Sequence, residues 1–146
     1  MTTKWHLRVR AVIYDDGKFL IVRTKDKSHS YLIGGHVEEG ESVPVALVRE
    51  VMEEAGKKCN VKEYLGTIEN KWQDGDVQQW EITHFFNIDL PGVKSDVNIL
   101  PAEEGYDFLW AAPSEFESIN LLPIPLRKLM KEWAEDNKET WWASTM

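Results

Sequence analysis

Short runs of β-branched and aromatic residues alternate with clusters of turn-forming residues along this chain, a pattern that predicts several strands. The segments with this pattern are 7–14, 18–23, 61–69, 77–90 and 106–111. Asp16 and Gly17 lie between the first two segments and predict that they form a β-hairpin. The sequence Asp74-Gly75-Asp76 predicts a second turn, between the third and fourth segments. Residues 24–30 and 34–40 are expected to be loops.

One segment between these strands has helical periodicity instead. Its apolar residues recur at every fourth position, at Val43, Leu47, Val51 and Ala55. Ser42 is the expected N-cap, Pro44 falls in the first turn, and Gly56 follows as the C-terminal cap. A second amphipathic helix is expected over 126–134, after a helical turn at 113–116. These elements predict an α/β domain in which helices cover both faces of a mixed sheet.

Composition narrows the class of protein. A chain of 146 residues without an evident linker or repeat predicts one domain over 1–146. The net charge of -8 disfavours binding to nucleic acid backbones or to anionic membranes, both of which need a basic surface. Cys59 is the single cysteine, so a disulfide framework and a cysteine-rich zinc site are excluded. Neither a signal peptide nor a membrane span is indicated, and a cytoplasmic location is expected.

The helix over 43–55 carries an unusual concentration of charge. Glu50, Glu53 and Glu54 project from one face, because residues advance by ~100° around the helix axis and all three fall within ~100°. Like charges at this spacing are mutually unfavourable, whereas a hard divalent cation prefers such oxygen ligands. A solvated acidic surface is the alternative interpretation, and it is the commoner one for three glutamates taken alone.

The wider spacing favours a metal site. Gly35 precedes Glu41 by six positions, the pair Arg49-Glu50 follows, and Glu53-Glu54 and Gly56 close the segment. At ~7% usage for each residue type, seven such matches arise by chance on the order of once in 10⁸ start positions. This segment, residues 35–56, resembles the Nudix box of the Nudix hydrolase family. The resemblance implies a single-domain α/β/α sandwich with a mixed sheet, and a MutT-like enzyme.

The resemblance also implies roles for the residues of the box. Glu50 and Glu54 are expected to bind a divalent metal directly, and Glu53 directly or through water. The backbone carbonyl of Gly34 is a further candidate ligand. Mg²⁺ is the expected ion, with Mn²⁺ as an alternative, and it would activate water and neutralise phosphate charge. Glu50 and Glu53 are therefore candidate catalytic residues as well.

Three other residues of the box are expected to support these carboxylates. A guanidinium at Arg49 can bridge carboxylates and fix their orientation, so Arg49 is a candidate catalytic residue and Glu41 its partner. Gly35 is expected to have a supporting role in the loop before the helix. A plain surface ion pair is the alternative for Arg49.

Outside the box, Glu81 shares one strand face with Thr83 and Phe85. A carboxylate from this region often completes metal binding or acts as the base in the family, so Glu81 is a candidate catalytic residue; a solvent-facing glutamate is the equal alternative. Three arginines are candidate phosphate ligands or ordinary surface charges, namely Arg8, Arg10 and Arg23. Trp72 and Trp80 could stack on a nucleobase, although core packing is favoured.

The function implied by the resemblance is metal-dependent cleavage of a phosphoanhydride bond in a nucleoside diphosphate linked to another group, such as a nucleoside triphosphate. The alternative is a Nudix-fold module that senses a nucleotide without cleaving it, but such a module would normally have lost a carboxylate of the box. An isopentenyl diphosphate isomerase would need a catalytic cysteine in a suitable loop, and the position of Cys59, just after the box helix, does not resemble that arrangement. The proline that marks ADP-ribose hydrolases is absent near residues 71–73.

The expected partner is a small nucleotide-like molecule, bound by a monomer or homodimer; the sequence does not identify the base or sugar.

Overall fold

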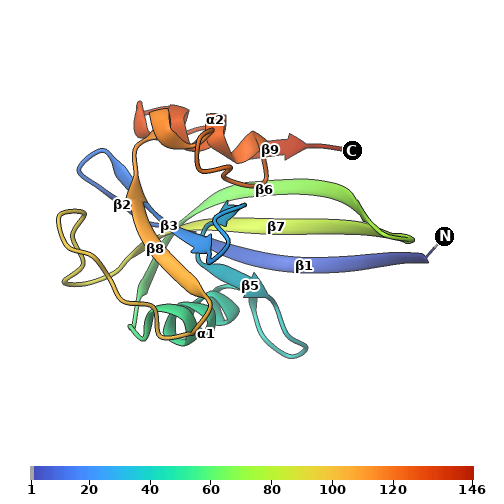
Figure 1. Ribbon diagram of the computed structural model, residues 1–146, viewed down its shortest axis with the longest axis horizontal. Coiled ribbons are helices and arrows are strands. Elements are labelled where there is room, and N and C mark those ends of the chain that lie inside the picture. Colours follow the sequence, from blue (N-terminus) through green and yellow to red (C-terminus); the bar gives the residue numbers. More distant parts are fainter. Residues whose placement is uncertain (1) are drawn as a thin grey trace.

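The computed structural model describes residues 2–146, in which nine strands, two α-helices and one 3-10 helix follow one another (Figure 1). The strands are β1 (Thr2–Val12), β2 (Tyr14–Asp15), β3 (Lys18–Thr24), β4 (Ser30–Tyr31), β5 (Gly34–His36), β6 (Asn60–Asp74), β7 (Val77–Asp89), β8 (Tyr106–Ala111) and β9 (Trp141–Ser144). The helices are α1 (Val43–Ala55), η1 (Pro113–Glu115) and α2 (Pro125–Ala134). Among these residues, no helix is both long enough and apolar enough to span a membrane.

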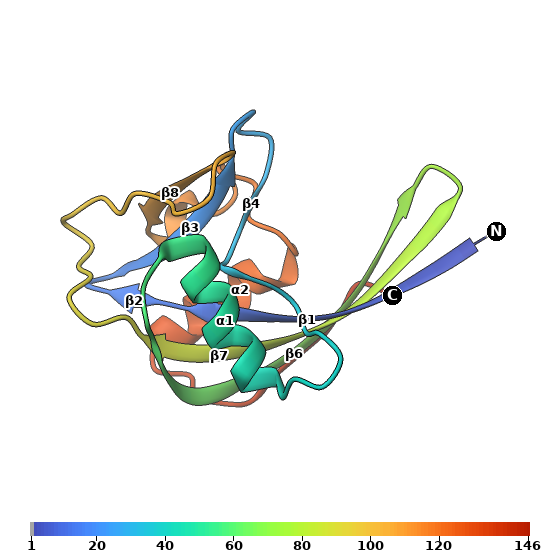
Figure 2. The same cartoon turned by 90° about the horizontal axis from the view of Figure 1, so that it is seen from below.

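Two sheets organise the fold. The larger has the strand order β5-β1-β7-β6-β9 and is mixed, because β1 pairs parallel with β7 and β9 parallel with β6, while the other pairs are antiparallel. The smaller contains β2, β3 and β4, with β8 paired to β3. Strands β1, β6 and β7 are long and extend together beyond the rest of the domain (Figure 2). The predicted α/β class with a mixed sheet is confirmed.

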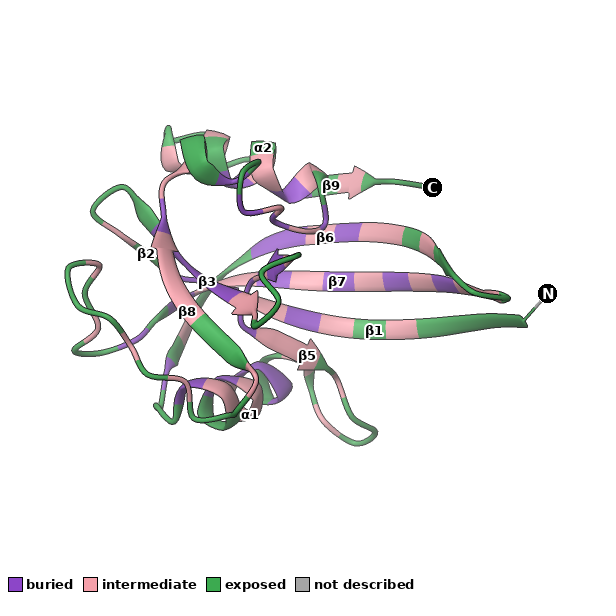
Figure 3. Cartoon of the chain, in the orientation of Figure 1, coloured by how far each residue is buried: buried purple, intermediate pink, exposed green. Residues whose placement is uncertain are grey.

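The two α-helices lie on opposite sides of the larger sheet and close two hydrophobic cores (Figure 1). On one side α1 packs with alternate residues of β1 such as Val9 and Ala11. On the other side α2 packs with Phe85 of β7 and with Trp141 of β9. Buried and half-buried positions alternate along much of β7, because successive side chains point to opposite faces of the sheet (Figure 3).

Helix α1 begins and ends as its sequence predicts. The Ser42 hydroxyl accepts a hydrogen bond from the backbone N–H of Val45, and Pro44 lies in the first turn. At the other end Gly56 adopts a left-handed conformation, with φ of 65°, and its N–H donates to the Met52 carbonyl. The helix buries Ala46, Leu47, Val51 and Ala55, which leaves the glutamate face free for other contacts.

Three expectations about strands were wrong. The hairpin predicted for 7–14 and 18–23 is reduced to the short β2–β3 pair, because β1 is held between β5 and β7 of the other sheet. The expected loop at 34–40 begins with a strand, β5, whose glycines pair with β1. Strand β6 runs to Asp74, beyond its predicted end at residue 69, although the turn lies at Gly75 and Asp76, within the predicted turn sequence.

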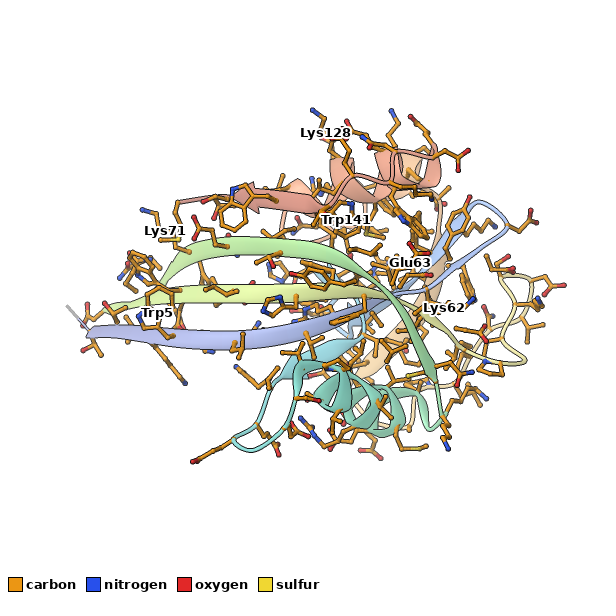
Figure 4. The ribbon with its side chains drawn as sticks, turned by 180° about the vertical axis from the view of Figure 1, so that it is seen from behind. Trp5, Lys62, Glu63, Lys71, Lys128 and Trp141 are labelled. Carbon is orange, nitrogen blue, oxygen red and sulfur yellow. The ribbon has the colours of Figure 1, made fainter. Side chains whose placement is uncertain are left out.

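The tail contains a strand that the sequence pattern did not indicate. In β9 the Trp141 side chain is buried and lies 5.7 Å from Phe85 between ring centroids, so it packs back on the domain (Figure 4). Its neighbour Trp142 faces solvent. Gly66 of β6 makes this close approach feasible, since a Cβ at that position would overlap the Trp141 backbone.

Candidate active site

Arg49 of α1 is the centre of an ion-pair network that joins the helix to the preceding loop. Its guanidinium binds both carboxylate oxygens of Glu41, at 2.6 and 2.9 Å, and also donates to the His36 carbonyl at 3.0 Å. The same group reaches Glu50 at 3.1 Å and Glu53 at 3.3 Å. The bond from Arg49 lowers the pKa of Glu41 to about 2, and Glu41 in turn raises the pKa of Arg49. This fork geometry is specific to a guanidinium.

Glu54 points to the other side, toward the start of β5. One carboxylate oxygen accepts a hydrogen bond from the Gly34 N–H at 3.1 Å. Burial raises the pKa of Glu54 to about 8; the nearby Arg10 opposes the shift, and the Glu50 carboxylate reinforces it. Glu54 is thus held in a setting that disfavours its charge.

Gly35 allows Glu50 to approach the backbone of β5. A Cβ at position 35 would lie 2.5 Å from Oε1 of Glu50 and 2.6 Å from its carboxyl carbon. Any other residue would therefore displace the Glu50 carboxylate. The predicted supporting role of Gly35 stays a prediction, and this close approach gives it a steric basis.

The three glutamates are not gathered into one preformed cluster. Within residues 2–146, no group of three acidic or histidine side chains is arranged to hold a metal ion. Arg49 draws Glu53 outward, where its side chain is 48% exposed, while Glu54 turns to Gly34. Glu50 and Glu54 nevertheless line one cavity with Gly34 and Gly35. Two neighbouring carboxylates, one of them with a raised pKa, are a donor set that a divalent cation fits, because the cation would offset their repulsion.

Two cavities meet at a pair of arginines. The first, of about 500 Å³, contains the glutamates, and the second, of about 690 Å³, lies toward β6 and the segment before α2. Arg8, Arg10 and Tyr31 line both cavities. Arg10 donates to the Leu32 carbonyl at 2.8 Å, and burial together with the adjacent Arg8 lowers the pKa of Arg10. Cationic groups therefore separate a carboxylate-lined cavity from a larger cavity.

Glu81 and two of the three candidate arginines lie at the cavities, and the third arginine does not. Glu81 is 6% exposed and lies 3.1 Å from Arg8, so the solvent-facing interpretation was wrong; its place is in the larger cavity, across the arginines from Glu54. Arg8 and Arg10 face these cavities, whereas Arg23 lines neither.

The tryptophans also differ from expectation. Trp72 lines the larger cavity, while Trp80 contacts Trp5 on the opposite face of the strands, at 4.9 Å between ring centroids. Neither belongs to the two buried cores, so core packing was the wrong interpretation for both. Cys59 is buried in the α1 core, and burial raises the pKa of its thiol, which is unsuited to a nucleophile.

Several cavity residues were not anticipated from sequence. Tyr31, Asn70 and the segment 122–124 line the larger cavity, and Tyr106 lines the smaller one. They come from separate strands and loops and carry no local motif. Strand register is the only signal that could have placed Asn70, which is directly opposite Glu81.

Comparisons with known proteins give consistent results. The model of the NUDIX domain family matches residues 4–136. The chain is 34% identical over 118 residues to the ADP-ribose pyrophosphatase of Methanocaldococcus jannaschii, an alignment that covers 79% of this chain and 63% of that protein. It is 30% identical over 126 residues to the CTP pyrophosphohydrolase of Escherichia coli, over 81% and 85% of the two chains. The chain thus spans less than two thirds of the archaeal relative.

The fold is also similar to solved structures. The solution structure of the Escherichia coli ORF135 protein superposes with a TM-score of 0.64 and 27% identity, over 92% of this chain and 93% of that one. The similarity therefore extends across the sheets and both helices and is not confined to the glutamate helix.

Proposed function

Because this chain belongs to the NUDIX domain family, we propose that it is a metal-dependent pyrophosphohydrolase that cleaves a phosphoanhydride bond in a nucleoside triphosphate. The observation that carries the proposal is the pair of cavities: a carboxylate-lined cavity and a larger one share Arg8 and Arg10 in their linings. A polyphosphate spanning the arginines would have its reacting end beside the glutamates.

Members of this family typically depend on a divalent metal, and Mg²⁺ is the proposed ion, with Mn²⁺ as an alternative. Glu50 and Glu54 would hold it, together with Glu53 directly or through water and the carbonyl of Gly34. When bound, the ion would supply Lewis acidity at a phosphate oxygen and lower the pKa of a water molecule. The raised pKa of Glu54 supports this assignment, because a bound cation would favour the ionised carboxylate.

Arg49 and Glu41 act as positioning residues in this proposal. Their two hydrogen bonds tie α1 to the loop before it, and the remaining contacts of Arg49 orient Glu50 and Glu53. Arg8 and Arg10 bind phosphate oxygens, since they are the cations that both cavities share. Arg23, which lines neither cavity, is removed from the phosphate-binding set.

A nucleoside triphosphate is preferred to ADP-ribose as substrate on two grounds. The Escherichia coli relative, which is named a CTP pyrophosphohydrolase, is matched over 85% of its length, whereas the archaeal ADP-ribose pyrophosphatase is matched over 63%. The proline typical of ADP-ribose hydrolases is also absent. CTP is accordingly the first substrate to test.

The test is a phosphate and pyrophosphate release assay with Mg²⁺ over nucleoside triphosphates, dinucleotides, sugar nucleotides and ADP-ribose. The proposal expects hydrolysis of a triphosphate, abolished by EDTA and restored by Mg²⁺. The alternative function, a nucleotide sensor, predicts binding without turnover for every compound. Turnover that persists in EDTA would refute the metal-dependent mechanism.

A further inference from the structure

We propose that the larger cavity holds the nucleobase and that Glu81 and Asn70 select a base with an exocyclic amino group beside an unprotonated ring nitrogen, as in cytosine. The inference rests on the proposed function and names the substrate class for the same site. It assigns Glu81 a role in specificity, in place of the catalytic role expected from the family.

The floor of the cavity contains an acceptor next to a donor. Asn70 of β6 and Glu81 of β7 are directly opposite in the antiparallel register, so both side chains leave the sheet on the same face. Both residues line the 690 Å³ cavity. A planar base edge can therefore meet the two groups together.

Glu81 has unused capacity to accept a hydrogen bond. It is 6% exposed, and although Arg8 lies 3.1 Å from its Oε2, that oxygen has no hydrogen-bond partner among residues 2–146. This oxygen is ion-paired with Arg8 yet accepts no hydrogen bond, and Glu81 lines the cavity, so a ligand that presents a donor to the carboxylate would be favoured. A phosphate oxygen cannot do so, because it is anionic, whereas a base amino group can.

Asn70 is oriented as a donor by its neighbours. The backbone N–H of Lys71 donates to the Thr145 hydroxyl at 3.1 Å, and that hydroxyl donates to Oδ1 of Asn70. With its oxygen engaged by Thr145, which lines the same cavity, Asn70 is left with its Nδ2 hydrogens for a ligand. The strand pair therefore presents one acceptor, at Glu81, and one donor, at Asn70.

The surroundings fit a flat, partly apolar group. Trp72 and Tyr31 supply aromatic surface, and Leu122, Pro123 and Ile124 supply apolar surface on the segment before α2. Arg8 and Arg10 anchor the phosphates at the boundary of the two cavities, so the position of the base edge relative to Glu81 is limited. This anchoring is why the donor and acceptor pattern can discriminate between bases.

Cytosine matches the pattern, and uracil does not. In cytosine the amino group on C4 can donate to Glu81 while N3 accepts from Asn70. In uracil O4 would face the Glu81 carboxylate, and the N3–H would face the Asn70 amide hydrogens. Discrimination by a pair of matched hydrogen bonds is roughly ten-fold to a hundred-fold.

The test compares kcat/KM for CTP and UTP, with ATP and ITP as a second amino and keto pair. The wild-type protein should prefer CTP to UTP by roughly ten-fold or more. Glu81→Gln should bring this ratio within about three-fold of one, because a glutamine amide can either accept from an amino group or donate to O4. Asn70→Asp should lower kcat/KM for CTP more than for UTP, since it removes the donor to N3. Glu63→Gln, at an exposed carboxylate elsewhere on β6, is the matched control and should leave the ratio unchanged (Figure 4).

The outcomes separate this inference from the proposed function. A wild-type ratio near one, or an equal loss of activity on CTP and UTP in Glu81→Gln, would overturn the base-selection role; the equal loss is the result expected of a general base or metal ligand. If no nucleotide is hydrolysed, the proposed function fails, and calorimetric affinities for CTP and UTP still decide the inference. If the melting temperature of Glu81→Gln is well below that of the wild type, the ratio of kcat/KM for CTP and UTP in Asn70→Asp decides the inference instead.

Discussion

Replacing Glu54 by glutamine should remove a pH-dependent destabilisation of the metal-free protein. Burial next to Glu50 raises the pKa of Glu54 from its usual 4.5 to about 8 in the folded chain. Between these values the folded protein keeps a proton that the unfolded chain releases. Stability therefore falls as the pH rises from about 4.5 to 8, and the loss is greatest above the folded pKa.

The magnitude follows from linkage. One proton retained on folding changes the free energy of unfolding by at most about 1.4 kcal/mol per pH unit. For a domain of this size, each 1 kcal/mol shifts the melting temperature by roughly 3 °C. Glu54 should therefore contribute a fall of up to about 4 °C per pH unit, which Glu54→Gln abolishes because the amide does not titrate.

The assay is thermal unfolding in EDTA between pH 5 and 8 for the wild type, Glu54→Gln and the exposed-site control Glu63→Gln. The wild type and the control should show the same slope, and Glu54→Gln a shallower one. Mg²⁺ should flatten the wild-type slope, since a cation stabilises the ionised carboxylate. Parallel curves for the wild type and Glu54→Gln would refute the reasoning, because the buried carboxylate would then not be the source of the pH dependence.

Three further substitutions test the surrounding contacts. Arg49→Lys should lower kcat by roughly ten-fold or more while the protein stays folded, because an ammonium cannot make the bidentate contact with Glu41. Steady-state kinetics equal to those of the wild type would show that this pair is only a surface contact. Gly35→Ala should raise the Mg²⁺ concentration needed for half-maximal activity by roughly ten-fold, since the added Cβ would lie 2.5 Å from the Glu50 carboxylate. An unchanged Mg²⁺ titration would contradict this prediction. Ser42→Ala should cost about 1 kcal/mol of stability, seen as a fall of roughly 3 °C in melting temperature, and should leave kcat unchanged.

The glutamate helix was predictable because its determinants are local. The Ser42 cap, the four-residue apolar repeat and Gly56 each act within a turn or two of chain, so they specify the helix before any tertiary contact forms. The identity of the charged face is equally local. Its orientation is not, because Arg49 is held by Glu41 and the His36 carbonyl, and Glu54 by the Gly34 N–H. These contacts depend on the path of the loop before the helix.

Strand partners could not be read from the same pattern. Residues 7–14 and 18–23 carry a turn signal that is compatible with a hairpin, yet β1 gains more by pairing along its length with β7, where eleven residues are in register. The strand β9 has only four residues, and its stability comes from a non-local contact, the burial of Trp141 against Phe85. Alternation along β7 did predict the shared face of Glu81 and Phe85, but not what that face encloses.

The charge balance of the site links substrate binding to the metal. A net charge of -8 would repel a triphosphate unless the field near the site is reversed. Arg49 cannot do this, because its guanidinium is already engaged by carboxylates, and Arg8 is shared with Glu81. Arg10 is then the main cation of the shared boundary, and its charge is opposed by the nearby carboxylates of Glu81 and Glu54. A divalent ion held by Glu50 and Glu54 would make the electrostatic potential in the smaller cavity positive. Nucleotide affinity should therefore depend on Mg²⁺ even where no bond is cleaved.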